Sequence, residues 1–236
     1  MNERELGPTL RDILERITEA AARAGRNSAS VEVVAITKTV PPVRIRAAIE
    51  AGFRTLGENR VQERQSKAAE LGDAPSATWH LVGPLQSNKA RRAVELFDVI
   101  ETVDSVDLAQ RLGRSAAELR PGQALPVLLQ VNVDEDAAKS GFEPGGLERD
   151  LAAILDVPGL SVDGLMTVGR LVDDPEAARP TFAALRGLSE RLRARDGRLG
   201  VALSMGMSHD FEVAVEEGAT LVRIGSAIFG ARPSVR

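Results

Sequence analysis

The sequence contains no cysteine, no tyrosine and only two histidines, His80 and His209, among its 236 residues. The absence of cysteine excludes disulfides, thiolate nucleophiles and metals held by cysteine. Two histidines are too few for a histidine-rich metal site, and we predict no bound metal. Without tyrosine, no mechanism that uses a tyrosine as its acid or base can operate.

Long apolar runs are also missing. No stretch approaches the ~18 apolar residues of a membrane-spanning helix, and residues 1–26 are charged throughout, unlike a secretory signal peptide. The 30 Lys and Arg residues against 34 Asp and Glu residues give a net charge of -4. This balance offers no electrostatic basis for binding nucleic acid or an anionic membrane. We therefore expect a soluble, cytoplasmic protein with neither kind of partner.

The length and patterning suit one α/β domain over residues 1–236. A (β/α)8 barrel takes roughly 250 residues, and the 43% hydrophobic content is enough for a large core. The sequence has no low-complexity tract and no long linker. Apolar residues at helical spacing over 10–24 predict a helix in an N-terminal segment, 1–26, that packs on this domain.

Short runs rich in β-branched residues alternate with helical patterns along the rest of the chain. This alternation predicts parallel βαβ units, and eight such units close into a TIM barrel. An open doubly wound sheet is the alternative, but no G-x-G-x-x-G motif follows the first strand. The predicted strands cover 31–37, 55–58, 78–82, 99–103, 126–133, 160–168, 202–205 and 220–224. The predicted helices cover 43–51, 61–71, 88–96, 106–119, 147–155, 176–195, 211–217 and 226–230.

Lys38 is the first candidate for chemistry. It directly follows the apolar first strand, and the C-terminal ends of the strands form the active site of a (β/α)8 barrel. Partial burial at such a position lowers the pKa of a lysine and makes its amine a nucleophile toward carbonyl carbons. The alternative is a lysine that ends an exposed strand, and for Lys38 taken alone this alternative is favoured.

The loops after the seventh and eighth strands are typical of a phosphate site. Gly225 lets backbone N–H groups approach an anion, and Ser226 is placed to cap the following helix, whose N-terminus attracts phosphate. Ser204 and Ser208 would add hydroxyl donors from the seventh strand. An ordinary turn with a serine cap would give the same pattern at residues 225–226.

Two further polar residues fall within predicted strands. Arg223 lies in an apolar run, so we expect it to be buried and to need a partner. That partner is either a carboxylate across the barrel, such as Glu58, or a ligand atom that accepts a hydrogen bond. His80 is either a ligand contact or a core histidine with its hydrogen bonds satisfied, and the second interpretation is favoured.

The remaining polar candidates are weaker. His209 opens a helix and is expected to face solvent. The basic run at 86–92 also begins a helix, where cations are disfavoured unless an anion is near, and a solvated face is the favoured interpretation. Lys139 is equally compatible with an exposed loop and with a role near the site.

Several blocks of the sequence, in the same order, resemble the YggS/PROSC family, the pyridoxal phosphate homeostasis proteins. The resemblance extends from about residue 31 to residue 232. A chance match of so many ordered blocks is not credible. They are Thr37-Lys38-Thr39, 57–63 (GENRVQE), 79–89 (WHLVGPLQSNK), 139–142 (KSGF), 164–166 (GLM), 204–210 (SMGMSHD) and 222–230 (VRIGSAIFG).

The resemblance implies a barrel like the N-terminal domain of alanine racemase that binds pyridoxal 5'-phosphate. It implies that Lys38 carries this cofactor as a Schiff base, that Arg223 faces the pyridine nitrogen, and that Asn59 lies near the ring. The family often has a second lysine two positions after the first, whereas this chain has Val40. The predicted cofactor-binding residues are Lys38, Asn59, His80, Ser204, Ser208, Arg223, Gly225 and Ser226.

Cofactor binding does not by itself make an enzyme. Racemisation needs a base on each face of the substrate carbanion, and alanine racemase supplies a lysine and a tyrosine, the latter from a second chain's extra domain. This sequence has no tyrosine and ends shortly after the eighth predicted strand. An arginine opposite the pyridine nitrogen also disfavours ring protonation and weakens the ring as an electron sink.

We therefore expect a monomeric carrier or buffer that acts in vitamin B6 homeostasis and passes its cofactor to apo-enzymes, with no catalytic residue of its own. A weak racemase or another pyridoxal phosphate enzyme is the first alternative. A Schiff-base aldolase that binds a phosphorylated sugar is the second, with Glu58 and His80 as its nearest acid or base candidates.

Overall fold

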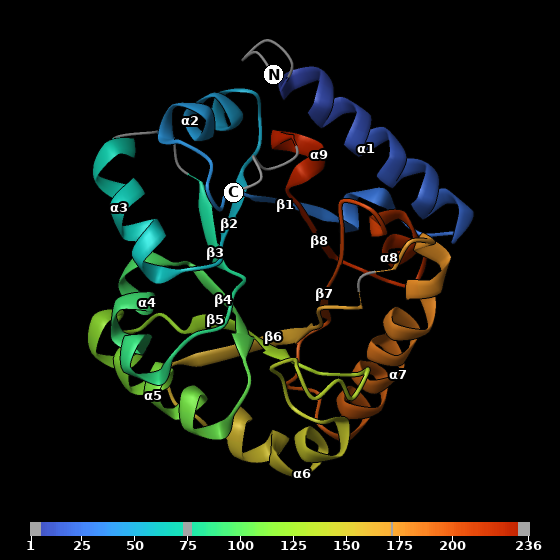
Figure 1. The fold of residues 1–236 in the computed structure, drawn as a ribbon. Helices are drawn as coiled ribbons and strands as arrows, with labels where there is room; N and C mark the ends of the chain where they lie inside the picture. The colour runs from blue at the N-terminus through green and yellow to red at the C-terminus, as the bar shows by residue number, and fades with distance from the viewer. Residues whose placement is uncertain (1–5, 73–76, 171, 231–236) are drawn as a thin grey trace.

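Eight parallel strands close into a barrel at the centre of the molecule, and helices surround it (Figure 1). The computed structural model describes residues 6–72, 77–170 and 172–230. Each strand pairs with the next along the chain, and β8 closes the barrel against β1. The predicted TIM barrel is confirmed, with all eight strands in place. They are β1 (Glu32–Ile36), β2 (Thr55–Glu58), β3 (Thr78–Leu81), β4 (Val99–Val103), β5 (Leu125–Gln130), β6 (Leu160–Met166), β7 (Ala202–Met207) and β8 (Leu221–Ile224).

A helix follows each strand and covers the outside of the barrel. Local signals set where these helices begin: Ser105 caps α5 by accepting a hydrogen bond from the Leu108 amide, and α2 and α6 start at Pro42 and Pro144. The predicted helices 88–96 and 176–195 each begin with a 3-10 turn, Ser87–Lys89 and Pro175–Ala178. The helices are α2 (Pro42–Glu50), α3 (Val61–Leu71), α4 (Ala90–Leu96), α5 (Val106–Leu119), α6 (Pro144–Leu155), α7 (Arg179–Arg195), α8 (Phe211–Glu216) and α9 (Ser226–Phe229).

An additional helix, α1 (Leu6–Arg23), precedes the barrel and packs beside α8 and α9 (Figure 1). It begins four residues before the predicted start, and residues 1–5 of the predicted segment lie outside the described residues. Its apolar face is buried. On its polar face, Arg16 lies 4.6 Å over the Phe211 ring and donates to Glu212 at 2.8 Å. The helix thus packs on the side of the barrel.

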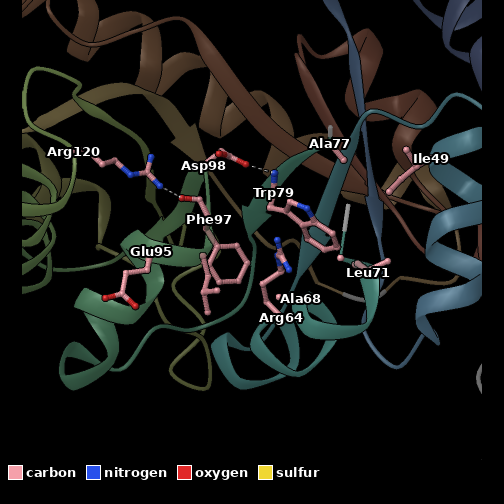
Figure 2. A pocket seen from close by; sticks show the side chains of 12 residues that line it. Ile49, Arg64, Ala68, Leu71, Ala77, Trp79, Glu95, Phe97, Asp98 and Arg120 are labelled. Carbon is pink, nitrogen blue, oxygen red and sulfur yellow. Dashed lines mark hydrogen bonds between the residues drawn. The ribbon is translucent and has the colours of Figure 1, made fainter. Parts of the chain in front are cut away.

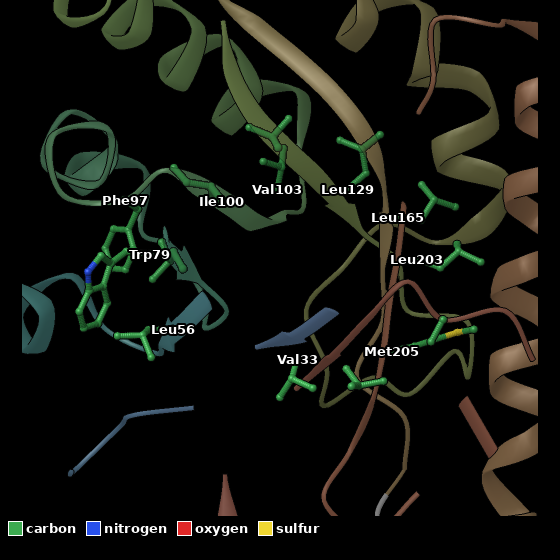
Figure 3. Packing of buried hydrophobic residues seen from close by; sticks show 14 of the residues in the cluster. Val33, Leu56, Trp79, Phe97, Ile100, Val103, Leu129, Leu165, Leu203 and Met205 are labelled. Carbon is green, nitrogen blue, oxygen red and sulfur yellow. The ribbon is translucent and has the colours of Figure 1, made fainter. Parts of the chain in front are cut away.

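The apolar side chains of the strands form two layers, because successive side chains along a strand point to opposite faces of the sheet. One layer faces the helices and includes Val33, Leu56, Leu129 and Leu165 (Figure 3). The other consists of Val34, Leu128, Met166 and Leu221, which come from β1, β5, β6 and β8. Because β1 and β5 are not neighbours in the sheet, these side chains meet across the barrel interior. Burial of each such side chain contributes roughly 1.5–3 kcal/mol to stability.

Two features are absent from the described residues. None of the helices there is long and apolar enough to cross a membrane. No group of three or more histidine and acidic side chains in the same residues could hold a metal ion.

Candidate functional site

A cavity of about 480 Å³ opens at the C-terminal ends of β1, β7 and β8. Its size falls within the ~300–1,000 Å³ of small-molecule sites, and its position is that of active sites in this fold. Five of the eight predicted cofactor-binding residues line it, namely Lys38, Ser208, Arg223, Gly225 and Ser226. The other lining residues are Ile36, Thr39, Val40, Pro41, Arg44, Val172, Met207, His209, Asp210, Phe229 and Gly230.

Lys38 reaches the cavity from the turn after β1. Val34 and Ile36 face the barrel interior, and the two-residue alternation of a strand carries Lys38 to that same side. It is the one lysine among the lining residues of the described chain. Val40 is buried in the cavity wall at the position where the resembling family often has a second lysine. The cavity therefore offers a single primary amine beside an apolar wall.

The loop after β8 directs backbone amides at one oxygen. The amides of Gly225 and Ala227 donate to Ser208 Oγ at 3.1 and 3.4 Å. A side chain at position 225 would place its Cβ 3.3 Å from the Ile36 Cβ, so glycine permits the close packing of this loop. Converging N–H groups of this kind form an anion-binding concavity. This part of the cavity can accept the oxygens of a phosphate.

Two details of this region differ from the sequence expectation. The predicted cap by Ser226 is wrong, because Gly225 is the N-cap, makes no side-chain cap bond, and precedes a helix of only four residues. The strand before it, β7, runs two residues further than predicted, through Gly206. Gly206 has φ of +89°, and a Cβ there would lie 2.5 Å from the Ala214 Cβ. Glycine is therefore required for the turn that presents Ser208.

A buried network of hydrogen-bonded polar groups in the barrel interior holds Arg223 in place. Its Nη1 donates to Ser204 Oγ at 2.7 Å and its Nη2 to the Thr167 carbonyl at 2.7 Å. The Ser204 hydroxyl donates to Glu101 Oε2 at 2.5 Å, and Glu101 Oε1 lies 2.6 Å from His80 Nδ1. Since β4 and β7 are not neighbours, the contact between Glu101 and Ser204 crosses the barrel interior.

Opposite charges balance within this buried network of hydrogen bonds. Burial raises the pKa of Glu101, but the His80 hydrogen bond, the charge of Arg223 and the Ser204 hydrogen bond outweigh it and lower the pKa below its ordinary value. Burial lowers the pKa of Arg223, whereas Glu101 and Asp210 raise it, and the guanidinium stays charged. Among the described residues, the Arg223 cation thus lies at the cavity floor, and the Glu101 carboxylate in the barrel interior balances its charge.

The prediction of Glu58 as a possible partner of Arg223 is therefore wrong. Glu58 faces outward from β2, where its Oε1 accepts from Thr37 Oγ1 and Lys67 Nζ, both at 2.6 Å. Side chains of neighbouring positions on a strand point to opposite faces, and the inward position of β2 is Gly57, whose Cβ would meet Ile36 and Val34. The carboxylates near Arg223 are Glu101 and Asp210.

Three predicted residues do not line the cavity. Ser204 is fully buried and its hydroxyl already binds Glu101 and Arg223. His80 is a core histidine satisfied by Glu101, as the favoured interpretation held. Asn59 follows β2 and packs tightly against Gly83, where a Cβ would lie 2.3 Å from the Asn59 carbonyl oxygen. Ser204 and His80 are connected to the cavity through Arg223.

The weaker candidates are engaged in ion pairs or lie at the surface. Lys139 Nζ lies 3.2 Å from Asp134 Oδ2, outside the cavity lining. In the basic run 86–92, Arg91 pairs with Glu118 at the exposed surface, which fits a solvated face. His209 is exposed, donates a hydrogen bond from Nε2 to the Asp173 carbonyl, and also lines the cavity rim.

Two lining residues and one supporting residue were missed by sequence reasoning. Arg44 of α2 lines the cavity, and its Nη1 donates to the Phe229 carbonyl at 3.1 Å. Asp210 accepts from the Met207 amide at 2.6 Å, and burial raises its pKa. Glu101 carried a usable signal, since a charged residue between apolar residues of a predicted strand needs a buried partner.

A second cavity, of about 310 Å³, opens at the opposite end of the barrel near Trp79 and Phe97 (Figure 2). There the Arg64 guanidinium stacks 4.0 Å from the Trp79 ring centroid. Within the described residues, Arg64 Nε and Nη1 are buried and make no hydrogen bond. In this fold that end of the barrel serves stability.

Acid sensitivity follows from Glu101. Because its folded pKa lies below the ordinary 4.5, ionised Glu101 stabilises the fold above that pH, and the contribution is lost as the pH falls through the folded pKa. We expect the free energy of unfolding to fall more steeply between about pH 5 and pH 3 in the wild type than in Glu101→Gln. Urea unfolding at four pH values measures both slopes, and equal slopes would contradict this assignment.

Comparison with known proteins places the chain. Residues 10–233 match the alanine racemase N-terminal domain family. The chain belongs to this family. A member from Pseudomonas aeruginosa, a pyridoxal phosphate homeostasis protein, is 45% identical over 223 residues that cover 93% of both chains. The homeostasis protein of Escherichia coli K12 is 40% identical and covers 97% of both. The family resemblance predicted from the ordered sequence blocks is confirmed.

Solved structures of other proteins give the same fold. PipY of Synechococcus elongatus, solved with pyridoxal phosphate bound, is 42% identical with a TM-score of 0.81 and covers 91% of this chain and 100% of its own. Alanine racemase of Clostridium difficile, at 15% identity and a TM-score of 0.73, covers 97% of this chain and 58% of its own. The latter likeness concerns the fold alone.

Proposed function

We propose that this protein binds pyridoxal 5'-phosphate in the cavity at Lys38 and acts in pyridoxal phosphate homeostasis by holding and releasing it. One observation carries the proposal. The single lysine of the cavity and the amides that converge beside Ser208 line the same space of about 480 Å³. An amine at one side and anion-binding N–H groups at the other match the aldehyde and the phosphate of this cofactor.

The lining residues fit the cofactor group by group. Lys38 supplies the amine that forms a Schiff base with the aldehyde. Ser208, Gly225 and Ser226 supply hydroxyl and backbone donors for the phosphate. When bound, pyridoxal phosphate supplies an electrophilic aldehyde and an electron-withdrawing ring. Arg223, fixed by Ser204 and Thr167, holds a positive charge at the cavity floor, where we propose that it faces the ring nitrogen.

The comparisons support the same function. The relatives at 40–45% identity are named pyridoxal phosphate homeostasis proteins, and the cyanobacterial PipY structure contains this cofactor. The Ser204 and His80 predicted for cofactor contact act, in this proposal, through Arg223. Asn59 remains a proposed neighbour of the ring.

A carrier fits the chemistry of the cavity better than an enzyme. The sequence has no tyrosine to serve as the second acid or base of a racemase. The Arg223 guanidinium disfavours protonation of a ring nitrogen beside it, which weakens the ring as an electron sink. We propose that the carrier acts as a monomer. We propose cytoplasmic apo-enzymes that use pyridoxal phosphate as recipients.

The test begins with the visible spectrum of the purified protein titrated with pyridoxal phosphate, before and after borohydride. We expect an absorbance band that borohydride abolishes, with the reduced adduct located on Lys38 by mass spectrometry. An apo-aspartate aminotransferase, added as the probe, should regain activity from the loaded protein. A protein that stays colourless would overturn the proposal, and steady turnover of an amino acid would replace the carrier with an enzyme.

Ser208→Ala tests the phosphate end separately. Its hydroxyl lines the cavity and already accepts from two amides of the β8 loop, and a hydrogen bond to a charged group is worth about 1.5–3 kcal/mol. We expect Ser208→Ala to weaken binding of pyridoxal phosphate roughly tenfold or more and to leave binding of pyridoxal, which lacks the phosphate, unchanged. Spectroscopic titration with both aldehydes measures this. An equal loss for both ligands would place the phosphate elsewhere.

A further inference from the structure

The peptide groups on both sides of the Lys38 Cα are held by side chains of one helix, α3. The carbonyl of Thr37, in the peptide before Lys38, accepts from Lys67 Nζ at 2.7 Å. The amide of Thr39, in the peptide after Lys38, donates to Glu63 Oε1. Because the two peptide planes meet at the Cα, fixing both of them fixes the direction in which the Lys38 side chain leaves the backbone.

One residue of this turn has a strained backbone conformation. Val40 donates back to the Thr37 carbonyl at 2.9 Å, which makes a four-residue turn with Lys38 and Thr39 at its centre. Thr39 has φ of +64°, a region that glycine or asparagine usually occupies in such turns. For a β-branched residue this conformation is unfavourable and persists only where neighbouring groups enforce it. The Glu63 carboxylate, which accepts the hydrogen bond of the Thr39 amide, is such a group.

Lys67 connects the two sides of the clamp. Its side chain is 8% exposed, and its Nζ also lies 2.6 Å from Glu58 Oε1 and 2.8 Å from Glu63 Oε1. The three acceptors use the three donors of the ammonium. Burial raises the pKa of Glu63, but the hydrogen bonds from Lys67 and from the Thr39 amide outweigh it and lower the pKa, so Glu63 is an ionised acceptor.

We propose that Lys67 and Glu63 are positioning residues that aim the Lys38 amine into the cavity and thereby set how fast the bound cofactor is released. The inference rests on the proposed function. Neither residue lines the cavity, so they act through the backbone of the Lys38 turn. When the clamp is intact, Lys38 is presented in one orientation and the Schiff base is held. When it is loosened, the orientation varies, and water would add more readily to the C=N bond, returning the cofactor's aldehyde and the free amine of Lys38.

A purely structural role predicts a different outcome. Buried ion pairs add little net stability compared with apolar residues of similar size, so the clamp is not needed simply to attach α3. A more exposed ion pair that also binds a backbone carbonyl lies far along the chain, where Arg186 of α7 donates to the carboxylate of Glu217 at 2.6 Å and to its carbonyl at 3.1 Å. Arg186→Met therefore serves as the matched control.

The decisive comparison uses Glu63→Ala and Glu63→Gln. Alanine removes the acceptor of the Thr39 amide, whereas glutamine keeps an oxygen in that place. With the loaded protein and excess apo-aspartate aminotransferase as the acceptor, we expect release from Glu63→Ala to be about tenfold faster than from the wild type, and release from Glu63→Gln to stay within about threefold. Equal release rates for Glu63→Ala and Arg186→Met would overturn the proposal.

Lys67 is tested in a background that avoids an unpaired buried carboxylate. Lys67→Met alone would strand Glu58, which is fully buried, so the variant is combined with Glu58→Gln. We expect the double variant, like Glu63→Ala, to release the cofactor about tenfold faster than the wild type. Release at the wild-type rate from a folded double variant would remove Lys67 from the clamp.

A measurement on the protein without cofactor separates the clamp from the proposed function. Hydrogen exchange at the Thr39 amide, followed by NMR, should be protected in the wild type and faster in Glu63→Ala, with Glu63→Gln between them. Unchanged exchange would overturn the clamp whatever the protein binds. A wild type that forms no reducible adduct at Lys38 but shows the expected exchange would overturn the proposed function and retain the clamp geometry.

Discussion

We expect Lys38→Ala to abolish the adduct that borohydride fixes and to lower the affinity for pyridoxal phosphate by roughly a hundredfold, equivalent to about 2.7 kcal/mol. The reason is that the cavity of the described chain contains one lysine, so no other primary amine there can bond to the aldehyde. The phosphate donors beside Ser208 stay in place, and we expect weak, colourless binding to remain. Absorbance titration and mass spectrometry after reduction measure both effects.

Two control variants isolate the amine. Lys38→Arg keeps the positive charge but cannot form a Schiff base at neutral pH, and we expect it to behave like Lys38→Ala. Lys139→Ala removes a half-buried lysine that pairs with Asp134 outside the cavity, and its spectrum should match the wild type. An adduct found on Lys139, or a coloured Lys38→Ala protein, would refute the assignment of Lys38.

The barrel could be predicted from the sequence because the patterns that indicate its strands and helices are local. Runs of β-branched residues such as those in β1 and β4, each followed by a helical pattern, marked the strands without any knowledge of contacts. The position of Lys38 followed directly, since a residue after an apolar strand lies at the functional end of this fold. The loop at Gly225 was recognisable for the same reason, although its helix proved too short for the expected serine cap.

The contacts that shape the site were not accessible because they join residues distant in the chain. Glu101 and Ser204 are 103 positions apart and meet only when β4 and β7 face each other across the closed barrel. Ser204 was therefore assigned to phosphate, whereas its hydroxyl lies between Glu101 and Arg223. Whether a strand residue points inward or toward the helices depends on register, which also explains why Glu58 was placed opposite Arg223.

The clamp below Lys38 combines both kinds of information. Glu63 and Lys67 are four residues apart on a predicted helix, a spacing that brings opposite charges together. Their contacts with the Thr37 carbonyl and the Thr39 amide depend on how α3 packs against the end of β1. The sequence signals an ion pair, and only the fold reveals what the pair holds.

Arg223→Met gives the largest expected loss of stability. It removes the cation above Glu101 and leaves a fully buried carboxylate short of its charge partner. Glu101 and Arg223 are joined through the Ser204 hydroxyl rather than in direct contact, and removing one of two opposite buried charges costs about 3–5 kcal/mol. At roughly 2–4 °C per kcal/mol for a chain of this length, the protein without cofactor should melt on the order of 10 °C lower.

Combining Glu101→Gln with Arg223→Met tests whether the loss of stability comes from the buried carboxylate. In Arg223→Met, the destabilising group is the stranded carboxylate, so making it neutral by Glu101→Gln should recover most of the lost stability. The double variant should therefore melt higher than Arg223→Met, and the coupling energy of the cycle should be at least about 1 kcal/mol. Thermal unfolding of the four proteins without cofactor gives this energy. Additive effects would mean that Arg223 is stabilised by Ser204 and Thr167 rather than by the carboxylate across the barrel.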